Sequence, residues 1–315
     1  MRKYVVMAAL LLAVMVFCPL AAMGAKSGEE NVIAPVISYS VENKTEYITV
    51  MSSSTGGTQR IEMREYLIGC VAAEMLPSCH EEALKAQVVA SYTYAKRLTE
   101  NSSDLITDSP LTHQGYADRQ KRIQIWGADF EKNEQKISQA VDAVYGCYLT
   151  YGGETALTLY HSISAGQTQS AVALWGEDYP YLQSVQSTGD RLSPDFISKS
   201  VFEPEEFADL LGIDDDADVA EWVEEIQTEN AYVTSAVICG KEFTASQIRD
   251  LLELKSTAFE ILCEEEKITV TCKGHGHGVG MSQYGADYMA RQGSTWQEIL
   301  LHYYPLTAIE KNEIY

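Results

Sequence analysis

The chain has 315 residues, of which 46% are hydrophobic and 22% are charged, and its formal net charge is −22. This composition is typical of a folded globular protein and excludes an intrinsically disordered chain. The acidic balance argues against electrostatic binding to nucleic acid or to an anionic membrane surface, because both need clustered Lys and Arg.

The first residues have the pattern of an export signal. Arg2 and Lys3 precede an apolar run that continues to Met23, as in a secretory n-region and h-region. We expect residues 1–24 to be a cleaved signal peptide or an uncleaved membrane anchor, because about 20 apolar residues just span a bilayer. Residues 25–44 then form a polar tether, and the protein acts outside the cytoplasm. The six cysteines after Cys18 show no CxxC spacing, which predicts free thiols.

Residues 45–310 are expected to form a single mixed helix and strand domain of the α+β class, with a substrate groove. Alternating and helical periodicities place the elements along it. The expected elements are a strand at 46–51 turning into 59–62, helices from 63 and from 81 to about 100, a helix through 137–144, a hairpin of 148–151 with 156–160, an acidic helical segment at 203–229, a strand at 233–238, a helix at 245–254 and a hairpin at 258–271.

Glu74 lies in line with the apolar stripe of the first helix. It follows Leu67 and Cys70 at helical spacing, and Pro77 then ends the helix. Residues 78–81 read Ser-Cys-His-Glu, the pattern of a capping box that starts the next helix. We therefore expect a half-buried carboxyl beside a tight turn, with a raised pKa that suits a general acid.

A glycine-rich run occupies residues 274–285, where five glycines in twelve residues permit close approach of the backbone to a ligand. His275 and His277 have the spacing of metal ligands, but no third ligand stands at a standard offset. We expect their rings to pack against a neighbouring loop or to line a polar groove. The run has no phosphate-binding signature. The loop-rich residues 161–190 are a second place where a binding site is expected.

Seven segments together carry a family resemblance. They are residues 71–77 (Val-Ala-Ala-Glu-Met-Leu-Pro), 83–87, 160–164, 175–176, 180–182, 275–286 (His-Gly-His-Gly-Val-Gly-Met-Ser-Gln-Tyr-Gly-Ala) and 298–305. In this set and order, residues 45–309 resemble the stage II sporulation protein D family. The resemblance implies a membrane-anchored lytic transglycosylase that needs no cofactor. It implies cutting of peptide-free peptidoglycan glycan strands during engulfment of the forespore, beside stage II sporulation proteins P and M.

The resemblance also implies roles for individual residues. The catalytic acid of the family matches Glu74, and its proposed groove matches Thr168 and Tyr181. Tyrosines are expected to stack on sugar rings, and hydroxyl or amide groups to bond sugar hydroxyls, although each is equally suited to an ordinary structural role. The candidate substrate-binding residues are Tyr160, Ser162, Thr168, Tyr181, His277, Gln283 and Tyr284.

The sequence departs from the family at three places. Tyr92 stands where the helix commonly has Arg, and Gln183 stands where Lys is often found, so an expected cation is missing near the site. Some members hold zinc through thiols and His in the loop at 107–114, where only His113 matches here. We therefore predict no metal.

A lytic transglycosylase works with a single carboxyl, whereas a hydrolysing glycosidase normally needs two. Three alternatives remain. The first is a non-catalytic peptidoglycan-binding protein that stimulates an amidase, as the related amidase enhancers are described to be. The second is a hydrolase that pairs Glu74 with Asp108, Glu177 or Asp178. The third is a cysteine peptidase built on Cys70 or Cys79, which is disfavoured because both thiols lie in apolar helical patterns.

Overall fold

The computed structural model describes residues 39–41, 45–101, 105–110, 112–213 and 218–313. The signal or anchor expected at 1–24 and nearly all of the tether at 25–44 lie outside the described residues. Inside them, no helix combines the length and the apolar character needed to cross a membrane.

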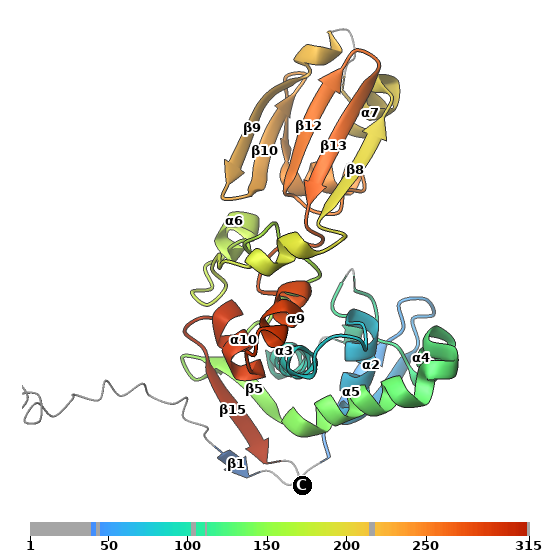
Figure 1. Ribbon diagram of the computed structural model, residues 1–315, viewed down its shortest axis with the longest axis vertical. Helices are drawn as coiled ribbons and strands as arrows, with labels where there is room; N and C mark the ends of the chain where they lie inside the picture. The colour runs from blue at the N-terminus through green and yellow to red at the C-terminus, as the bar shows by residue number, and fades with distance from the viewer. Residues whose placement is uncertain (1–38, 42–44, 102–104, 111, 214–217, 314–315) are drawn as a thin grey trace, which may run out of the picture. The chain divides into compact units, whose positions relative to one another are not determined.

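Helices and strands are mixed along the described chain (Figure 1), which agrees with the expected α+β composition. The helices are α2 (Met63–Glu74), α3 (Glu81–Asn101), α4 (Arg119–Trp126), α5 (Phe130–Val144), α6 (Ala171–Trp175), α7 (Pro204–Leu211), α8 (Ala245–Leu251), α9 (Gln283–Arg291) and α10 (Trp296–Tyr303). The strands are β1 (Tyr39–Val41), β2 (Tyr47–Met51), β3 (Thr58–Glu62), β4 (Ile106–Thr107), β5 (Cys147–Tyr151), β6 (Glu154–Thr155), β7 (Tyr160–His161), β8 (Ile197–Phe202), β9 (Val223–Glu229), β10 (Tyr232–Ile238), β11 (Lys241–Thr244), β12 (Phe259–Glu264), β13 (Lys267–Lys273), β14 (Met281–Ser282) and β15 (Ala308–Glu313).

Helix α3 is the centre of the larger hydrophobic core. Its middle is buried on all sides, and a helix of this kind is stable only when other elements surround it. Figure 1 shows α3 nearly end-on, between α2 on one side and α9 and α10 on the other. Helix α5 and strand β5 complete the enclosure, and β5 belongs to a four-stranded sheet of order β1-β15-β5-β6.

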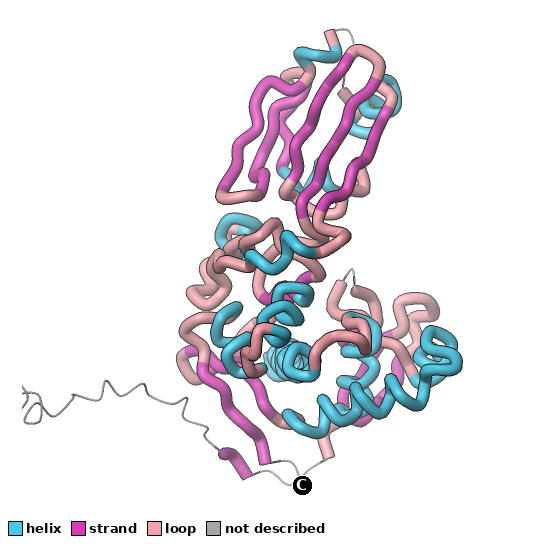
Figure 2. The backbone as a smooth tube through the Cα atoms, in the orientation of Figure 1, coloured by secondary structure: helices cyan, strands magenta, loops and turns pink. Residues whose placement is uncertain are grey.

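A second hydrophobic cluster lies in residues 202–272. Two three-stranded sheets, of order β12-β13-β8 and β11-β10-β9, enclose it together with α7 and α8. Figure 2 shows these strands gathered in one part of the chain, apart from the long helices. In the β12–β13 hairpin Cys263 pairs with Ile268, so it does not face Cys272. None of the six described cysteines forms a disulfide with another described residue; three are buried and three are half-buried.

Three predicted elements are wrong in detail. Among its described residues, the acidic segment at 203–229 is α-helical only in α7, with a further 3-10 turn at Val219–Glu221, because Gly212 ends α7 in a left-handed conformation and residues 223–229 pair with β10. The hairpin partner of β5 is β6, and Tyr160 instead begins β7, which runs parallel to β14. Helix α3 begins at Glu81, so His80 and not Ser78 precedes it; the His80 Nδ1 accepts the Glu82 N–H at 3.3 Å.

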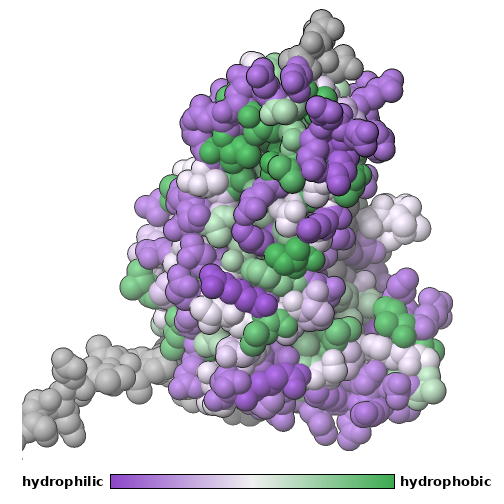
Figure 3. Space-filling view, turned by 45° about the horizontal axis from the view of Figure 1, so that its top comes forward, coloured by the Kyte–Doolittle hydropathy of each residue, from purple (hydrophilic) through white to green (hydrophobic). Residues whose placement is uncertain are grey.

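Figure 3 shows hydrophilic side chains over most of the face in view, with apolar side chains in separate groups between them. A net charge of −22 favours solubility. It also means that an anionic ligand is attracted only where positively charged side chains cluster locally.

Candidate active site

Glu74 is the last residue of α2, and its side chain is half-buried. The helix ends there because Met75 adopts an extended conformation, two residues before Pro77. The Gly115 N–H donates to Glu74 Oε1 at 2.5 Å, and the Gln283 side-chain amide lies 3.5 Å from Oε2. Burial raises the pKa of Glu74, although these two hydrogen bonds to the carboxylate oppose the rise. The burial and the raised pKa expected from the sequence are both present.

The loop that brings Gly115 to Glu74 depends on the absence of a side chain at this residue. A Cβ at position 115 would stand 2.9 Å from Glu74 Oε1 and 3.1 Å from the Ala73 Cβ. The loop is anchored two residues later, where the Ala117 N–H donates to the Gly69 carbonyl at 3.1 Å and buried Arg122 donates to the Ala117 carbonyl at 2.9 Å. The backbone donor to Glu74 is therefore held by the packing of this loop on α2.

Gln283 reaches Glu74 from the first turn of α9. Ser282 caps this helix by accepting the Gly285 N–H, and its hydroxyl donates to Asp190 Oδ1 at 2.8 Å. Asp190 is completely buried, and its other oxygen accepts from the backbone and the hydroxyl of Ser164. This buried carboxylate joins the 161–166 loop to the start of α9, and so it positions Gln283.

Glu74 stands between two adjoining cavities that share Glu74, Ser162, His275 and Gln283. We call the first, of about 560 Å³, the Trp175 arm, and the second, of about 430 Å³, the Asp287 arm. The Trp175 arm is further lined by Tyr94, Pro110, Thr112, His113, Leu159, Tyr160, His161, Trp175, Arg249, Gly276 and His277. The Asp287 arm is further lined by Met75, Leu76, Ser78, Cys79, Ile163, Ser193, Pro194, Asp195, Tyr284 and Asp287. A groove on both sides of one carboxyl suits a chain-like substrate.

Two histidine rings lie in the wall of the Trp175 arm. The His161 ring is buried and its Nδ1 contacts the Val279 carbonyl at 3.1 Å, whereas the His277 Nδ1 accepts the Val279 N–H at 3.1 Å. Loss of hydration lowers the pKa of His161 to about 3 and that of His277 to about 4, so both are neutral at physiological pH. Their rings lie 5.6 Å apart, and the Trp175 ring lies 5.9 Å from His277.

The described residues contain no group of three or more His, Cys, Asp or Glu side chains placed to hold a metal ion. His113, the remaining match to a zinc ligand, bonds Thr107 instead: its Nδ1 accepts the Thr107 N–H at 3.2 Å. These residues do not fit a zinc site.

Comparison with known proteins identifies the family. Residues 52–151 match the family model described as "Stage II sporulation protein". The chain is 36% identical over 274 residues to stage II sporulation protein D of Bacillus subtilis (strain 168), covering 85% of this chain and 80% of that protein. It is 37% identical over 264 residues to the protein of the same name from Bacillus amyloliquefaciens, covering 82% and 76%. The chain belongs to the stage II sporulation protein D family.

That family acts in sporulation. A more distant relative is the amidase enhancer of Bacillus subtilis (strain 168), which is 24% identical over 302 residues, covering 77% of this chain and 40% of that protein. Membership agrees with the resemblance described above, and the relatives' names do not state a reaction for this chain.

Most of the candidate substrate-binding residues meet in the groove. Tyr160, Ser162, His277 and Gln283 line the Trp175 arm with Glu74, and Tyr284 lines the Asp287 arm. The Tyr160 hydroxyl is already used, because it donates to the buried Gln114 amide at 2.8 Å.

Thr168 and Tyr181, the two positions that match the groove of the stage II sporulation protein D family, do not line either arm. Thr168 is completely buried, and its hydroxyl oxygen accepts the Val185 N–H at 2.8 Å. Tyr181 is 4% exposed, and its hydroxyl oxygen accepts the Leu157 N–H at 2.9 Å. Tyr181 lines a separate cavity of about 410 Å³. Neither side chain lines an arm with Glu74, so both are left out of the proposed groove.

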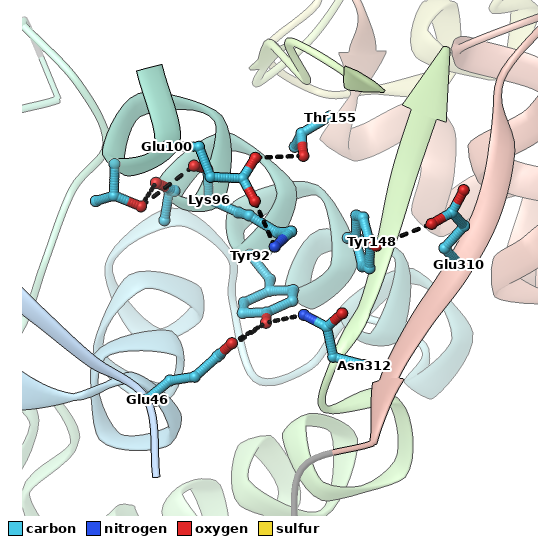
Figure 4. Close-up of polar contacts among 10 residues, drawn as sticks. Glu46, Tyr92, Lys96, Glu100, Tyr148, Thr155, Glu310 and Asn312 are labelled. Atoms are coloured by element: carbon cyan, nitrogen blue, oxygen red, sulfur yellow. Dashed lines mark hydrogen bonds and ion pairs between the residues drawn. The ribbon is translucent and has the colours of Figure 1, made fainter. Parts of the chain in front are cut away.

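Tyr92, where the family commonly has Arg, also lies away from the groove. Figure 4 shows its hydroxyl group between Glu46 and Asn312, near the strand that carries Tyr148. The hydroxyl donates to Glu46 at 2.6 Å and accepts from Asn312 at 3.2 Å. The expectation that Tyr92 removes a cation from the site is therefore wrong, because this face of α3 points to β15 and not to Glu74.

Sequence reasoning missed Arg249 and Asp287 as groove residues. Arg249 follows the buried Ile248 in α8, and Asp287 lies in the first half of α9. Neither helix has a local signal that separates a groove residue from an ordinary surface charge. Both positions depend on how distant segments pack together.

The structure also shows where the residues of two alternatives lie, namely the carboxylates of the hydrolase and the thiols of the cysteine peptidase. Asp108, Glu177 and Asp178 do not line either arm; Asp108 instead accepts the Ser53 N–H at 2.7 Å. Burial raises the pKa of the Cys70 thiol, and that of Cys79 to about 11, so neither is a thiolate at neutral pH. These groups support neither the paired-carboxylate hydrolase with those partners nor the cysteine peptidase.

Proposed function

We propose that this protein is a lytic transglycosylase that cleaves peptidoglycan glycan strands during cell-wall remodelling in sporulation. The observation that carries the proposal is the half-buried Glu74 carboxyl, whose pKa is raised by burial and which both arms of the groove share. Membership of the stage II sporulation protein D family supports the setting.

The proposed reaction uses Glu74 twice. The protonated carboxyl gives its proton to the glycosidic oxygen as the bond from that oxygen to C1 breaks. The C6 hydroxyl of the same sugar then attacks C1, and the Glu74 carboxylate takes the proton of that hydroxyl. The products are a free 4-hydroxyl on the leaving sugar and a 1,6-anhydro sugar, with no water consumed. Between the two transfers the Gly115 N–H and the Gln283 amide stabilise the carboxylate.

The remaining parts of this proposal concern the surroundings of the enzyme. Residues 45–310 act as the catalytic domain outside the cytoplasm, and the N-terminal segment targets them there as a cleaved signal or holds them at the membrane. The glycan strands are peptide-free, and stage II sporulation proteins P and M are the proposed partners. No cofactor takes part.

The relation to an amidase enhancer favours a second candidate, a protein that binds glycan strands and stimulates an amidase without cutting them. The two candidates differ in their products, because only the transglycosylase releases anhydro-sugar ends.

The test compares three proteins on purified peptide-free glycan, with the products identified by mass spectrometry. They are the wild type, Glu74→Gln, and the control Glu62→Gln, which changes an exposed carboxyl at the other end of the same helix. We expect 1,6-anhydro products from the wild type and the control only. Reducing ends in place of anhydro ends would select a hydrolase. Strand binding without any product would select the amidase-stimulating role.

A further inference from the structure

The two arms of the groove carry different charges. Among the described residues that line the Trp175 arm, Arg249 is the one Lys or Arg, and Glu74 is the one carboxylate. The Asp287 arm has Asp195 and Asp287 in addition to Glu74, and no Lys or Arg lines it, although Arg291 pairs with Asp287 at 2.7 Å from outside the lining. In a chain with a net charge of −22, a cation inside a groove is a local feature that composition does not predict.

Arg249 is oriented but not neutralised. Its Nε donates to the Leu254 carbonyl at 3.4 Å, a long bond to the backbone just after α8. No ion pair joins its guanidinium to a carboxylate of the described residues. The guanidinium has five N–H groups in a planar fork that matches a carboxylate, so most of its donors are available to a ligand.

Two further groups of this arm suit a sugar that carries an amide. The Trp175 ring is 49% exposed and offers an apolar face on which a sugar ring stacks. The His161 Nε2 is buried and has no hydrogen-bond partner among the described residues. Because His161 is neutral and its Nδ1 faces a carbonyl, Nδ1 carries the proton and Nε2 is an acceptor.

A stacking face, a buried acceptor and a cation match one sugar of peptidoglycan. N-acetylmuramic acid has an acetamido N–H that donates a hydrogen bond, and its lactyl ether ends in a carboxylate when no peptide is attached. N-acetylglucosamine has the acetamido group but no carboxylate, so it gains nothing from Arg249 and loses nothing beside Asp195 and Asp287.

We propose that the Trp175 arm is a subsite for an N-acetylmuramoyl residue whose lactyl carboxylate pairs with Arg249 and whose acetamido N–H donates to His161 Nε2. The Asp287 arm takes the N-acetylglucosaminyl residue on the other side of Glu74. This inference rests on the proposed function and adds the direction of the strand. The sugar that provides C1 and the attacking C6 hydroxyl lies on the Arg249 side, and the leaving sugar lies on the acidic side.

The test measures equilibrium binding in a Glu74→Gln background, so that no cleavage occurs. The two probes are peptide-free glycan strands and the same strands with their carboxylates reduced to alcohols. Arg249→Gln should weaken binding of the carboxylated strands by about tenfold or more, the effect of losing a charge-assisted hydrogen bond, and leave binding of the reduced strands unchanged. Arg249→Lys should recover part of the loss. The control Lys267→Gln removes a charge from the exposed β12–β13 hairpin and should change neither.

The pairing would be overturned if the Glu74→Gln protein bound both probes with the same affinity whether or not it also carried Arg249→Gln. A crystal structure of the Glu74→Gln protein with a peptide-free tetrasaccharide tests the direction, and a muramoyl carboxylate found in the Asp287 arm would overturn it. The binding results and the reaction products test the two proposals independently. Anhydro products from the wild type together with unchanged Arg249→Gln binding refute only the subsite, whereas discrimination of the probes without any product refutes only the transglycosylase.

Discussion

The contact between Gly115 and Glu74 yields the most specific prediction, because the substitution Gly115→Ala tests it by adding a single methyl group. In Gly115→Ala the new Cβ would stand 2.9 Å from Glu74 Oε1 and 3.1 Å from the Ala73 Cβ. The first distance is shorter than real Cβ atoms show and the second is unusually tight, so either the Glu74 carboxyl or the loop must shift. The movement lengthens the 2.5 Å hydrogen bond from the Gly115 N–H to the carboxylate.

The size of the effect follows from the charge on the acceptor. A hydrogen bond to a charged group contributes about 1.5–3 kcal/mol, and about 1.4 kcal/mol corresponds to tenfold in an equilibrium. This bond favours the ionised carboxyl, so its loss raises the pKa of Glu74 further and destabilises the protein most where Glu74 is ionised. We expect a loss of about 1.5–3 kcal/mol in the free energy of unfolding well above that pKa, and a smaller loss in acid.

Two measurements check this reasoning. Urea unfolding at pH of about 8 and about 4 compares the wild type with Gly115→Ala, and the pH–rate profile of anhydro-product release should move to higher pH in the variant. The control is Gly57→Ala, where the nearest heavy atom to the new Cβ is 3.4 Å away and φ is not positive. The same loss of stability at both pH values, or an unmoved rate profile, would refute the role of this hydrogen bond.

Three further predictions concern stability. Glu74→Gln should unfold with a higher free energy than the wild type at pH of about 8, because ionising a carboxyl of raised pKa costs folding energy above that pKa, and the gain should disappear at pH of about 4; a gain that is the same at both values would contradict this. Arg122→Leu should lower the free energy of unfolding in urea by about 3 kcal/mol, because this completely buried cation bonds carboxylates on two other elements. The control Arg64→Ala breaks an exposed ion pair and should lower it by no more than about 1 kcal/mol. Equal losses in the two variants would be inconsistent with the burial of Arg122. Tyr92→Phe should cost about 1 kcal/mol by leaving Glu46 without its donor, with the rate of glycan cleavage within about twofold of wild type, and a large fall in rate without unfolding would place Tyr92 in the site after all.

Local patterns predicted much of the region around Glu74. Apolar spacing located α2 and its end before Pro77, and it predicted a second helix over 81 to about 100, where α3 lies. Alternation located the hairpins β2–β3 and β12–β13. These features depend on residues within a few positions of each other, so they are visible in a short window of sequence.

The failures share a physical cause. The segment at 223–229 has acidic residues typical of an exposed helix, and it becomes a strand because β10 supplies hydrogen-bond partners. Thr168 and Tyr181 were assigned to the groove by family resemblance, but their hydroxyl oxygens accept backbone N–H groups inside the protein. A polar side chain binds a ligand or completes the core according to what packs against it, and a short window of sequence does not contain that neighbour.

The sequence by itself determined that Glu74 lies at a helix end with an apolar wall behind it, because that information is carried by residues one or two helical turns away. Only the tertiary structure decided what surrounds the carboxyl: Gly115 and Gln283 stand 41 and 209 residues further along the chain, and Arg249 enters the groove from a different hydrophobic cluster. Periodicity fixes which side of an element is buried, whereas the closing loops and distant charges are chosen by the packing of the whole chain.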